Sequence, residues 1–249
     1  MTVSRDRRGR ILVITIERED KRNAINAAVT AGLDAALNDL EDSPDLWCGI
    51  LTGGRRFFSA GADLAAGPGE PTPRGGIAGL IHRERVKPLI AAVEGFALGG
   101  GMELALCCDL IVAASDARFG LPEVKRGLMP DFGGAFRAVR ALPVNVAREM
   151  LRTGDDLPAD RAERLGFVNR LAAPGAALEV ALELAGRVCA NAPLATRAAL
   201  ATSAQAARGD EAALWEYSNA RHRELLGSED VREGIAAFFA RRSPDWQGR

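Results

Sequence analysis

The sequence is poor in the residues that most often bind metals or form covalent intermediates. It has two histidines and four cysteines in 249 residues, and no two cysteines have CxxC spacing. It also lacks GxSxG, HExxH and GxxxxGK, the motifs of serine hydrolases, zinc peptidases and P-loop enzymes. We therefore expect no metal site, and we expect the cysteines to be reduced thiols in apolar surroundings.

Long apolar runs and an excess of one charge are also absent. No apolar run approaches the roughly 20 residues of a membrane span, and the basic N-terminal stretch has no apolar signal core. Lysine and arginine number 32 and aspartate and glutamate 33, which gives a formal net charge of −1. This balance favours neither nucleic acid nor a membrane surface as a partner. We expect a soluble, cytoplasmic protein.

What the sequence does contain is an alternation of short β-rich runs with helical periodicity, which is typical of an α/β architecture. The predicted strands are 11–18, 47–54, 89–95, 110–115 and 168–173, and the predicted helices are 26–42, 77–86, 103–109, 145–154 and 158–166. From about Pro193 onward only helical patterns remain. The sequence therefore predicts an α/β core at 1–192 and a helical C-terminal segment at 193–249.

Three consecutive glycines, Gly99 to Gly101, precede Glu103 in the stretch GGGMEL. Glycine disfavours helix formation, but it permits tight turns and lets another molecule approach the backbone. The N–H groups at a helix start have no intrahelical acceptor, and the helix dipole favours negative charge there. The run therefore predicts either a site for a developing oxyanion or a tight helix–strand contact that needs small residues.

Two further loops combine small residues with carboxylates. The stretch FFSAGADL, residues 57–64, ends a strand in residues with accessible backbone N–H groups, which could join those of the glycine run in an oxyanion hole. The stretch ARFGLPEVKRGLMPDFGG, residues 117–134, carries Glu123 and Asp131 between glycines and prolines. Acidic residues in loops are most often only solvated, so these two are candidates because of their setting.

Six segments, in one order along nearly the whole chain, resemble the crotonase (enoyl-CoA hydratase/isomerase) superfamily. They are REDKRNAIN, FFSAGADL, VEGFALGGGMELALCCDLIVAA, ARFGLPEVKRGLMPDFGG, AERLGFVNRL and SEDVREGIAAFFARR. Any one motif is weakly specific, whereas all six in this order are highly specific. The resemblance implies a crotonase-like spiral of ββα units. It also implies a helical C-terminal oligomerisation segment that builds homotrimers, or hexamers made of two trimers.

The resemblance further implies that the protein binds acyl-CoA thioesters and stabilises a thioester enolate with two backbone N–H groups. By their positions in the motifs, these groups belong to Ala62 and Gly100. Removal of such a donor typically costs ~3–4 kcal/mol of transition-state stabilisation. Coenzyme A is then part of the substrate, and no separate cofactor is implied.

Glu103 and Glu123 match the two glutamates that flank the substrate double bond in hydratases of this family. Hydration needs water held against C3 and a proton delivered to C2 on the same face, which two carboxyl groups converging on one water can do. The resemblance gives Glu103 the activation of water and Glu123 the proton for C2. Like charges held close raise the pKa of one member, and such a pair can titrate as a unit.

Asp131 departs from the hydratase pattern, in which this position is glycine and its N–H helps to hold the water. Some relatives that are isomerases, or that form a naphthoate ring, have an aspartate here as the working acid–base. The alternative is structural: Asp131 could cap a helix that begins near Gly133, since aspartate is a strong capping residue. The sequence leaves both interpretations open.

The residues that the resemblance assigns to CoA binding come from three parts of the chain. A basic side chain and backbone near the N-terminus meet the CoA, the backbone after Ala62 meets the adenine, and C-terminal residues reach the CoA of a neighbouring subunit. The complete set is Lys21, Arg22, Ala24, Ala60, Asp63, Leu64, Phe238 and Arg241.

The predicted function is that of a 2-enoyl-CoA hydratase, which adds water across the double bond of an acyl-CoA thioester. One alternative is a Δ3,Δ2-enoyl-CoA isomerase that uses Asp131 or one of the glutamates. A remoter alternative is a CoA-binding protein without turnover. The presence of both glutamates and of the intact glycine run favours the hydratase.

Overall fold

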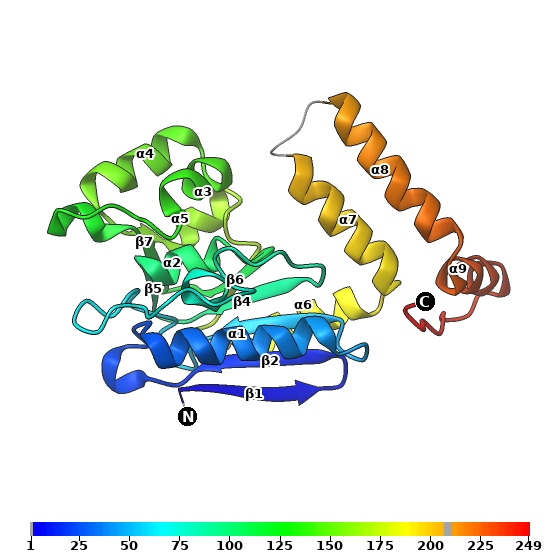
Figure 1. The fold of residues 1–249 in the computed structure, drawn as a ribbon, viewed down its shortest axis with the longest axis horizontal. Helices are drawn as coiled ribbons and strands as arrows, with labels where there is room; N and C mark the ends of the chain where they lie inside the picture. The colour runs from blue at the N-terminus through cyan, green and yellow to red at the C-terminus, as the bar shows by residue number, and fades with distance from the viewer. Residues whose placement is uncertain (1, 207–210) are drawn as a thin grey trace.

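Six strands form the main sheet, in the spatial order β1-β2-β3-β4-β6-β9 (Figure 1). The structure is a computed structural model and describes residues 2–206 and 211–249. The strands are β1 (Val3–Arg8), β2 (Ile11–Ile16), β3 (Cys48–Thr52), β4 (Leu89–Val93), β6 (Leu110–Ala114) and β9 (Arg170–Ala172). Only the β1–β2 pair is antiparallel, and the other neighbours in this sheet are parallel. Every residue of β3 and β4 is buried, as is usual for parallel strands covered on both faces.

A second, smaller sheet contains β5 (Phe96–Leu98), β7 (Arg118–Gly120) and β8 (Leu157–Pro158). Two isolated bridges, Ile25 with Ala62 and Ser59 with Ala97, extend this layer toward the N-terminal part of the chain. Consecutive strands enter the two sheets in turn: β4 lies in the first, β5 in the second, and a helix follows. The pair β6 and β7 repeats this order, which gives the predicted ββα spiral.

Helices cover the sheets on both sides. The helices of the core are α1 (Ala27–Asp42), α2 (Gly100–Ala105), α3 (Gly134–Ala141), α4 (Val144–Thr153), α5 (Ala159–Arg164) and α6 (Ala177–Cys189), with short 3-10 helices η1 (Glu19–Lys21), η2 (Ile77–Gly79) and η3 (Pro122–Arg126). The helix α1 begins at the capping residue Asn26, whose side chain accepts a hydrogen bond from the Val29 N–H at 3.1 Å. The helix α6 packs on the main sheet through alanines at four-residue spacing, Ala177, Ala181 and Ala185.

The C-terminal part of the chain is helical, with α7 (Pro193–Ala206), α8 (Glu211–Leu226) and α9 (Glu229–Ala240). Figure 1 shows α7 and α8 side by side and next to the core, with α9 at the far end. A cleft between the core and these helices is lined by residues of both, including Leu106 and Leu200. In the part of the chain that the structure describes, no helix is long and apolar enough to cross a bilayer.

The predicted helix at 77–86 is wrong. Its residues form only the single turn η2, in which Ala78 has φ 51°, and then an irregular stretch. The reason is tertiary: this segment hydrogen-bonds to α1 through side chains and so does not continue a helical ladder. The helix expected at 103–109 begins earlier, at Gly100, and ends at Ala105. The strand β1 and the helix α6 have no counterpart among the predicted elements.

Candidate active site

Two backbone N–H groups lie close together where α2 begins. Gly100 is the first residue of α2, so its N–H has no intrahelical acceptor. A Cβ atom on Gly100 would lie 3.2 Å from the Ala62 nitrogen, and one on Gly61 would lie 2.9 Å from the Gly100 nitrogen. Within the described residues, neither the Ala62 nor the Gly100 N–H donates to a backbone carbonyl. The two N–H groups predicted to form an oxyanion hole are therefore adjacent and available.

The loop that carries Ala62 is held by backbone hydrogen bonds to the N-terminal part of the chain. The Ile25 N–H donates to Gly61 O at 2.8 Å, and the Asp63 N–H donates to Ile25 O at 2.9 Å. Gly61 has φ 95°, a conformation that favours glycine, and its missing Cβ also lets the loop lie against the start of α2. These contacts fix the position of the Ala62 N–H.

Glu103 is the most deeply buried of the candidate acid–base residues, with 1% of its surface exposed. Its Oε1 accepts a hydrogen bond of 2.7 Å from the Gly134 N–H, the first N–H of α3. Burial, opposed by the Gly134 N–H and assisted by the charges of Glu123 and Asp131, raises the pKa of Glu103 to about 7. The site therefore holds a carboxyl group that titrates near neutral pH.

Glu123 lies on the other side of the glycine run, in the short helix η3. Its Oε1 would be 3.1 Å from a Cβ atom on Gly99, so the carboxyl group faces the start of α2. Its Oε2 is buried and has no hydrogen-bond partner among the described residues. Burial raises the pKa of Glu123, and the charge of Asp131 adds to this effect. A buried carboxylate oxygen without a partner calls for a water or a ligand atom at this place.

Asp131 is exposed, and its charge raises the pKa of both glutamates, so it lies near the pair. Of the two interpretations of Asp131, the structure contradicts the helix cap. The residue before α3 is Gly133, and no side chain of its own segment caps the helix. The physical reason is that Gly133, with φ 95°, occupies the cap position, so Asp131 lies two residues before it, and Glu103 from a different element accepts a hydrogen bond from the first N–H of α3. Among the described residues, no group of three histidines, cysteines or acidic residues is arranged to hold a metal ion.

The candidate CoA-binding residues of the N-terminal half lie on two adjoining segments, 21–24 and 60–64. The Ala60 N–H donates to Arg22 O at 3.0 Å, which joins the two segments directly. Lys21, Arg22 and Leu64 are exposed, the last to 73%. The structure thus brings Lys21, Arg22, Ala24, Ala60, Asp63 and Leu64 to one part of the surface, next to the Ala62 N–H.

The Asp63 side chain forms hydrogen bonds that stabilise the loop at this surface. Its Oδ2 accepts a hydrogen bond of 2.7 Å from Arg18 Nη1, and the same nitrogen donates to Ala24 O at 3.1 Å. Its Oδ1 accepts from the N–H groups of Ala65 and Ala66, and the hydrogen bond from Arg18 lowers the pKa of Asp63. The Asp63 side chain therefore holds the loop, and its backbone does so too, because the Asp63 N–H donates to Ile25 O and the Asp63 carbonyl accepts from the Gly67 N–H.

The two C-terminal candidates do not join this site within one chain. Arg241 follows α9 and is exposed, and Figure 1 shows α9 well apart from α2. The side chain of Phe238 lies outside the described residues. Their assignment to the CoA of a neighbouring subunit stays a prediction.

Two residues that support the site received no role from the sequence. Asn23 is fully buried, and its Nδ2 donates to the carbonyls of Gly53, Phe57 and Phe58 at 2.8, 3.0 and 3.2 Å. Arg18 ties Asp63 to the N-terminal segment. Asn23 lies inside the motif REDKRNAIN, but a buried amide cannot be told from an exposed turn residue by its sequence position.

Comparisons with known proteins concern the family and the fold of the whole chain. Residues 6–249 match the family model described as enoyl-CoA hydratase/isomerase. The chain is 42% identical to a carnitinyl-CoA dehydratase from Salmonella typhi and 38% identical to a 2,3-dehydroadipyl-CoA hydratase from Escherichia coli, each over 98% of this chain and 97% of the relative. The crystal structure of an enoyl-CoA hydratase from Mycobacterium tuberculosis matches with a TM-score of 0.96 and 45% identity, over 100% of this chain and 99% of that chain. These matches confirm the crotonase resemblance and the fold predicted from it.

Proposed function

The chain belongs to the enoyl-CoA hydratase/isomerase family, and we propose that it is a 2-enoyl-CoA hydratase. The enzyme adds water to C2 and C3 of an acyl-CoA thioester and catalyses the reverse dehydration. The observation that carries this proposal is the presence of two glutamates, the buried Glu103 and the half-buried Glu123, beside two adjacent backbone N–H groups. The reaction needs only water and these groups, because coenzyme A arrives as part of the substrate.

In this proposal the N–H groups of Ala62 and Gly100 bind the thioester oxygen. Addition of water at C3 moves negative charge onto that oxygen, and two fixed donors stabilise the charge most strongly in the transition state. The N-terminus of α2 adds the positive end of a helix dipole at the same place. The acyl-CoA then extends over the neighbouring segments 21–24 and 60–64, where Lys21 and Arg22 are exposed cations.

The two carboxyl groups handle the protons. For hydration, Glu103 accepts a proton from the water as it attacks C3, while Glu123 donates a proton to C2. For dehydration the roles reverse, and Glu103 protonates the leaving hydroxyl group while Glu123 removes the proton from C2. Both directions therefore require one proton on the pair and differ only in which glutamate holds it.

The burial of the two groups sets where this proton lies in the free enzyme. Glu103 is almost completely buried and its pKa is about 7, whereas Glu123 is partly accessible. The shared proton therefore rests mainly on Glu103, which is the state that starts a dehydration.

A Δ3,Δ2-enoyl-CoA isomerase is the second candidate, and Asp131 is the observation that favours it. This third carboxylate lies near the glutamate pair and has no capping role. An isomerase moves a proton between C4 and C2 of the same enolate, so one mobile carboxylate within reach of both carbons is sufficient. In this alternative Asp131 is the working base and one glutamate is dispensable.

Incubation with crotonyl-CoA and with a 3-enoyl-CoA separates the candidates. A hydratase removes the conjugated enoyl absorbance of crotonyl-CoA and forms the 3-hydroxyacyl-CoA, whereas an isomerase creates that absorbance from the 3-enoyl-CoA. Carnitinyl-CoA and 2,3-dehydroadipyl-CoA complete the panel, because relatives are named for them. Binding of acyl-CoA by calorimetry without turnover of any of these thioesters would contradict the proposal and favour a CoA-binding protein.

A further inference from the structure

Arg137, in the first turn of α3, joins two backbone segments that are distant in sequence. Its Nη1 donates to Phe132 O and its Nη2 donates to Ile81 O, both at 2.8 Å. The planar guanidinium suits this task because its nitrogens point in fixed directions and can serve two acceptors at once. The Arg137 guanidinium thus binds two carbonyl oxygens from two separate segments of the chain.

The first of these segments is the turn at 130–134, which carries the hydrogen-bond donor for Glu103. A Cβ atom on Gly133 would lie 2.5 Å from Arg137 Nη1, so the guanidinium lies directly against this turn. The next residue, Gly134, donates its N–H to Glu103 Oε1 at 2.7 Å. A Cβ atom on Gly134 would lie 2.9 Å from the same oxygen, so the peptide and the carboxyl group are in close contact. The position of this turn therefore decides whether Glu103 keeps its donor.

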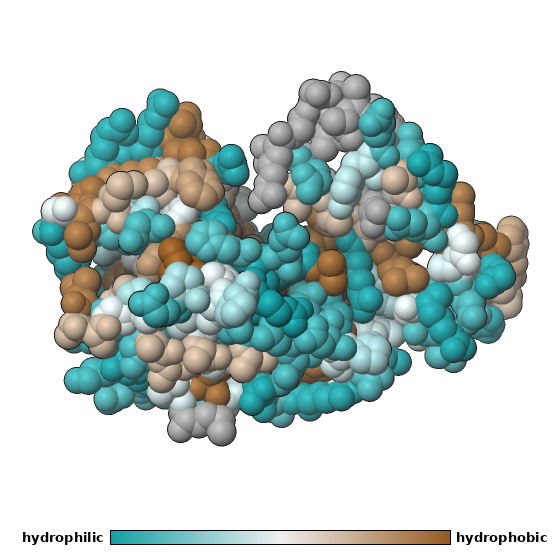
Figure 2. Space-filling model, viewed as in Figure 1, coloured by the Kyte–Doolittle hydropathy of each residue, from teal (hydrophilic) through white to brown (hydrophobic). Residues whose placement is uncertain are grey.

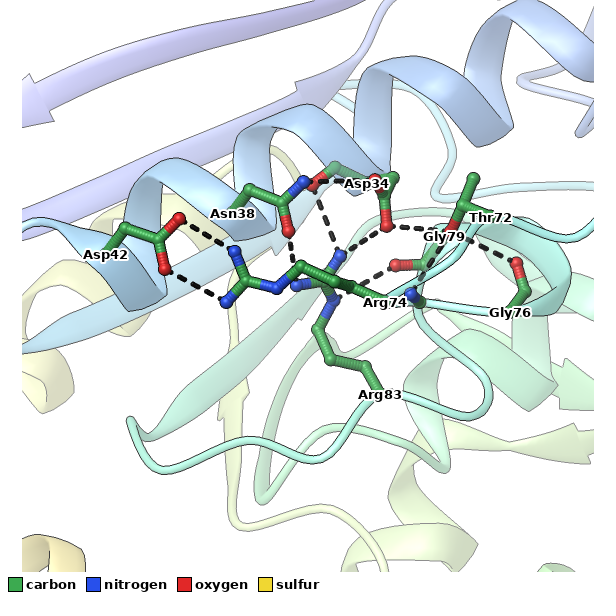
Figure 3. Close-up of polar contacts among 9 residues, drawn as sticks. Asp34, Asn38, Asp42, Thr72, Arg74, Gly76, Gly79 and Arg83 are labelled. Atoms are coloured by element: carbon green, nitrogen blue, oxygen red, sulfur yellow. Dashed lines mark hydrogen bonds and ion pairs between the residues drawn. The ribbon is translucent and has the colours of Figure 1, made fainter.

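The second segment is the loop at 72–83, which is fastened to α1 (Figure 3). Arg83 is buried, and it donates to Asp34 Oδ1 at 2.5 Å and to Asn38 Oδ1 at 2.8 Å. Its Nε also donates to Gly79 O at 3.2 Å. Thr72 Oγ1 donates to the same Asp34 oxygen at 2.7 Å, so one carboxylate holds both ends of the loop.

Further contacts hold the loop at 72–83 against α1. Arg74 forms a bidentate ion pair with Asp42 at 2.7 and 2.9 Å, as Figure 3 shows. The backbone at Gly79 touches α1, because a Cβ atom there would lie 2.6 Å from the Asp34 nitrogen. The carbonyl of Ile81, two residues later, is therefore a fixed acceptor for Arg137.

We propose that Arg137 is a positioning residue, which holds the Gly134 N–H against Glu103 by tying the 130–134 turn to the loop fastened on α1. This inference rests on the proposed function, in which Glu103 exchanges protons with water or the leaving hydroxyl group. Arg137 itself touches neither the substrate nor the reacting atoms in this account. Its effect on the reaction passes through the turn and Gly134.

The loss of this support has a specific consequence for Glu103. The hydrogen bond from Gly134 stabilises the ionised carboxylate and lowers its pKa, so a turn that withdraws leaves the pKa higher than about 7. In the free enzyme Glu103 is the last group of the pair to lose its proton. The alkaline limb of kcat/KM should therefore move to higher pH, while the rate at the optimum falls because the carboxyl group is misplaced.

Two substitutions and one matched control test this inference. Arg137→Met removes the donors, Arg137→Lys keeps the charge but has a single nitrogen, and Arg140→Met removes an exposed arginine of the same helix. The first measurement is the pH dependence of kcat/KM with crotonyl-CoA. The second is a ¹³C NMR titration of the Glu103 carboxyl, assigned with Glu103→Gln, which reports the pKa without requiring turnover. Thermal unfolding shows that each variant is folded.

We expect both Arg137 variants to raise the pKa of Glu103 by about one unit, which is a tenfold change in its protonation ratio, and to lower kcat about 10- to 100-fold. Arg140→Met should match the wild type. A wild-type Glu103 pKa in Arg137→Met would overturn the inference. A wild-type pKa in Arg137→Lys would also overturn it, because charge alone would then explain the role. Absence of hydratase activity in the wild type would refute the proposed function, and the NMR titration would still decide the role of Arg137.

Discussion

At the scale of single residues, the decisive feature is a carboxyl group buried where it must exchange protons. Glu103 has 1% of its surface exposed, and its carboxyl group accepts a hydrogen bond from the Gly134 N–H. Burial destabilises the ionised carboxylate by more than the Gly134 hydrogen bond stabilises it, so the pKa of Glu103 rises to about 7. The same burial that adapts Glu103 to catalysis at neutral pH makes the folded protein less stable once the group ionises.

This trade-off predicts that Glu103→Gln stabilises the fold at alkaline pH. The pKa of Glu103 is about 7 in the folded site and 4.5 without burial, so ionisation costs the folded state stability as the pH rises from 4.5 through 7. At about pH 8 the variant should unfold with up to ~3 kcal/mol more free energy than the wild type. Urea unfolding at about pH 8 and about pH 4 measures this, and the difference should vanish at the lower pH. Equal stabilities at both values would show that Glu103 is not buried as described.

The glutamate pair also predicts the pH dependence of the reaction. Hydration and dehydration both need one proton on the glutamate pair, so the pH dependence of kcat/KM should be bell-shaped. Its alkaline limb should lie at about pH 7, where Glu103 loses the shared proton. The acidic limb belongs to Glu123, whose pKa is also raised by burial. Initial rates across the pH range provide the test, at crotonyl-CoA concentrations below KM for hydration and at concentrations of its 3-hydroxyacyl-CoA product below KM for dehydration. A profile that rises steadily through pH 7 and stays high would contradict this protonation scheme.

At the scale of elements, the site forms where the start of α2 meets the loop at 61–62 and the turn before α3. Glycines make these contacts possible, since a Cβ on Gly100 would lie 3.0 Å from Phe132 Cε2 and 3.2 Å from the Ala62 nitrogen. The short helix α2 therefore offers both an N–H donor and, one turn later, the carboxyl group of Glu103. One element thus positions the oxyanion site relative to the proton-transfer group.

The oxyanion hole predicts a large effect of a side chain at Gly100. In Gly100→Val the added atoms would occupy the space between the two N–H donors, so the thioester oxygen could not approach them. Turnover should fall by at least two orders of magnitude, the usual effect of losing an oxyanion donor. Gly186→Val is the matched control, because a Cβ on this helical glycine meets nothing within 4 Å. A loss of less than about tenfold, or ~1.4 kcal/mol of barrier, would mean that the hole lies elsewhere.

The sequence predicted the parts of the site that depend on local chemistry. The glycine run and the two glutamates were found because helix starts and buried carboxylates have recognisable settings and match family motifs. The helix predicted at 77–86 and the cap considered for Asp131 are absent, and distant partners form hydrogen bonds at both places. Arg83 and Thr72 bind α1, and Glu103 takes the first N–H of α3. Local patterns cannot show which distant group will fill a hydrogen bond.

At the scale of the whole molecule, the helical tail has more apolar surface than one chain covers. Leu226 is 57% exposed and Ile235 is 56% exposed, and Figure 2 shows hydrophobic residues at the surface around α8 and α9. Exposed apolar residues of this size usually mark a contact with another chain. We propose that the tail joins subunits into a trimer, or a hexamer of two trimers, and that Arg241 reaches the CoA of a neighbour.

This proposal predicts that the tail is needed for assembly and for CoA binding. A chain that ends before Pro193 should be insoluble, or monomeric and inactive, because the tail supplies the subunit contacts. Light scattering of the full chain should give the mass of a trimer or hexamer, and the double variant Leu226→Glu/Ile235→Glu should shift it toward the monomer. A soluble, monomeric truncated chain with the CoA affinity of the full protein would contradict the role of the tail.

The most direct test of the account compares crotonyl-CoA hydration by the wild type with that by four carboxylate variants. If the glutamate pair performs the reaction, Glu103→Gln and Glu123→Gln should each lower the rate by roughly 10²–10⁴, the usual range for general acid–base groups. The double variant should be little worse than either, because the two act as a unit. Asp131→Asn removes the charge and keeps the backbone N–H, and it should change the rate by less than about tenfold, because Asp131 is exposed and solvent screens its charge. A crippled Asp131→Asn together with an unaffected Glu123→Gln would overturn the hydratase and support the isomerase.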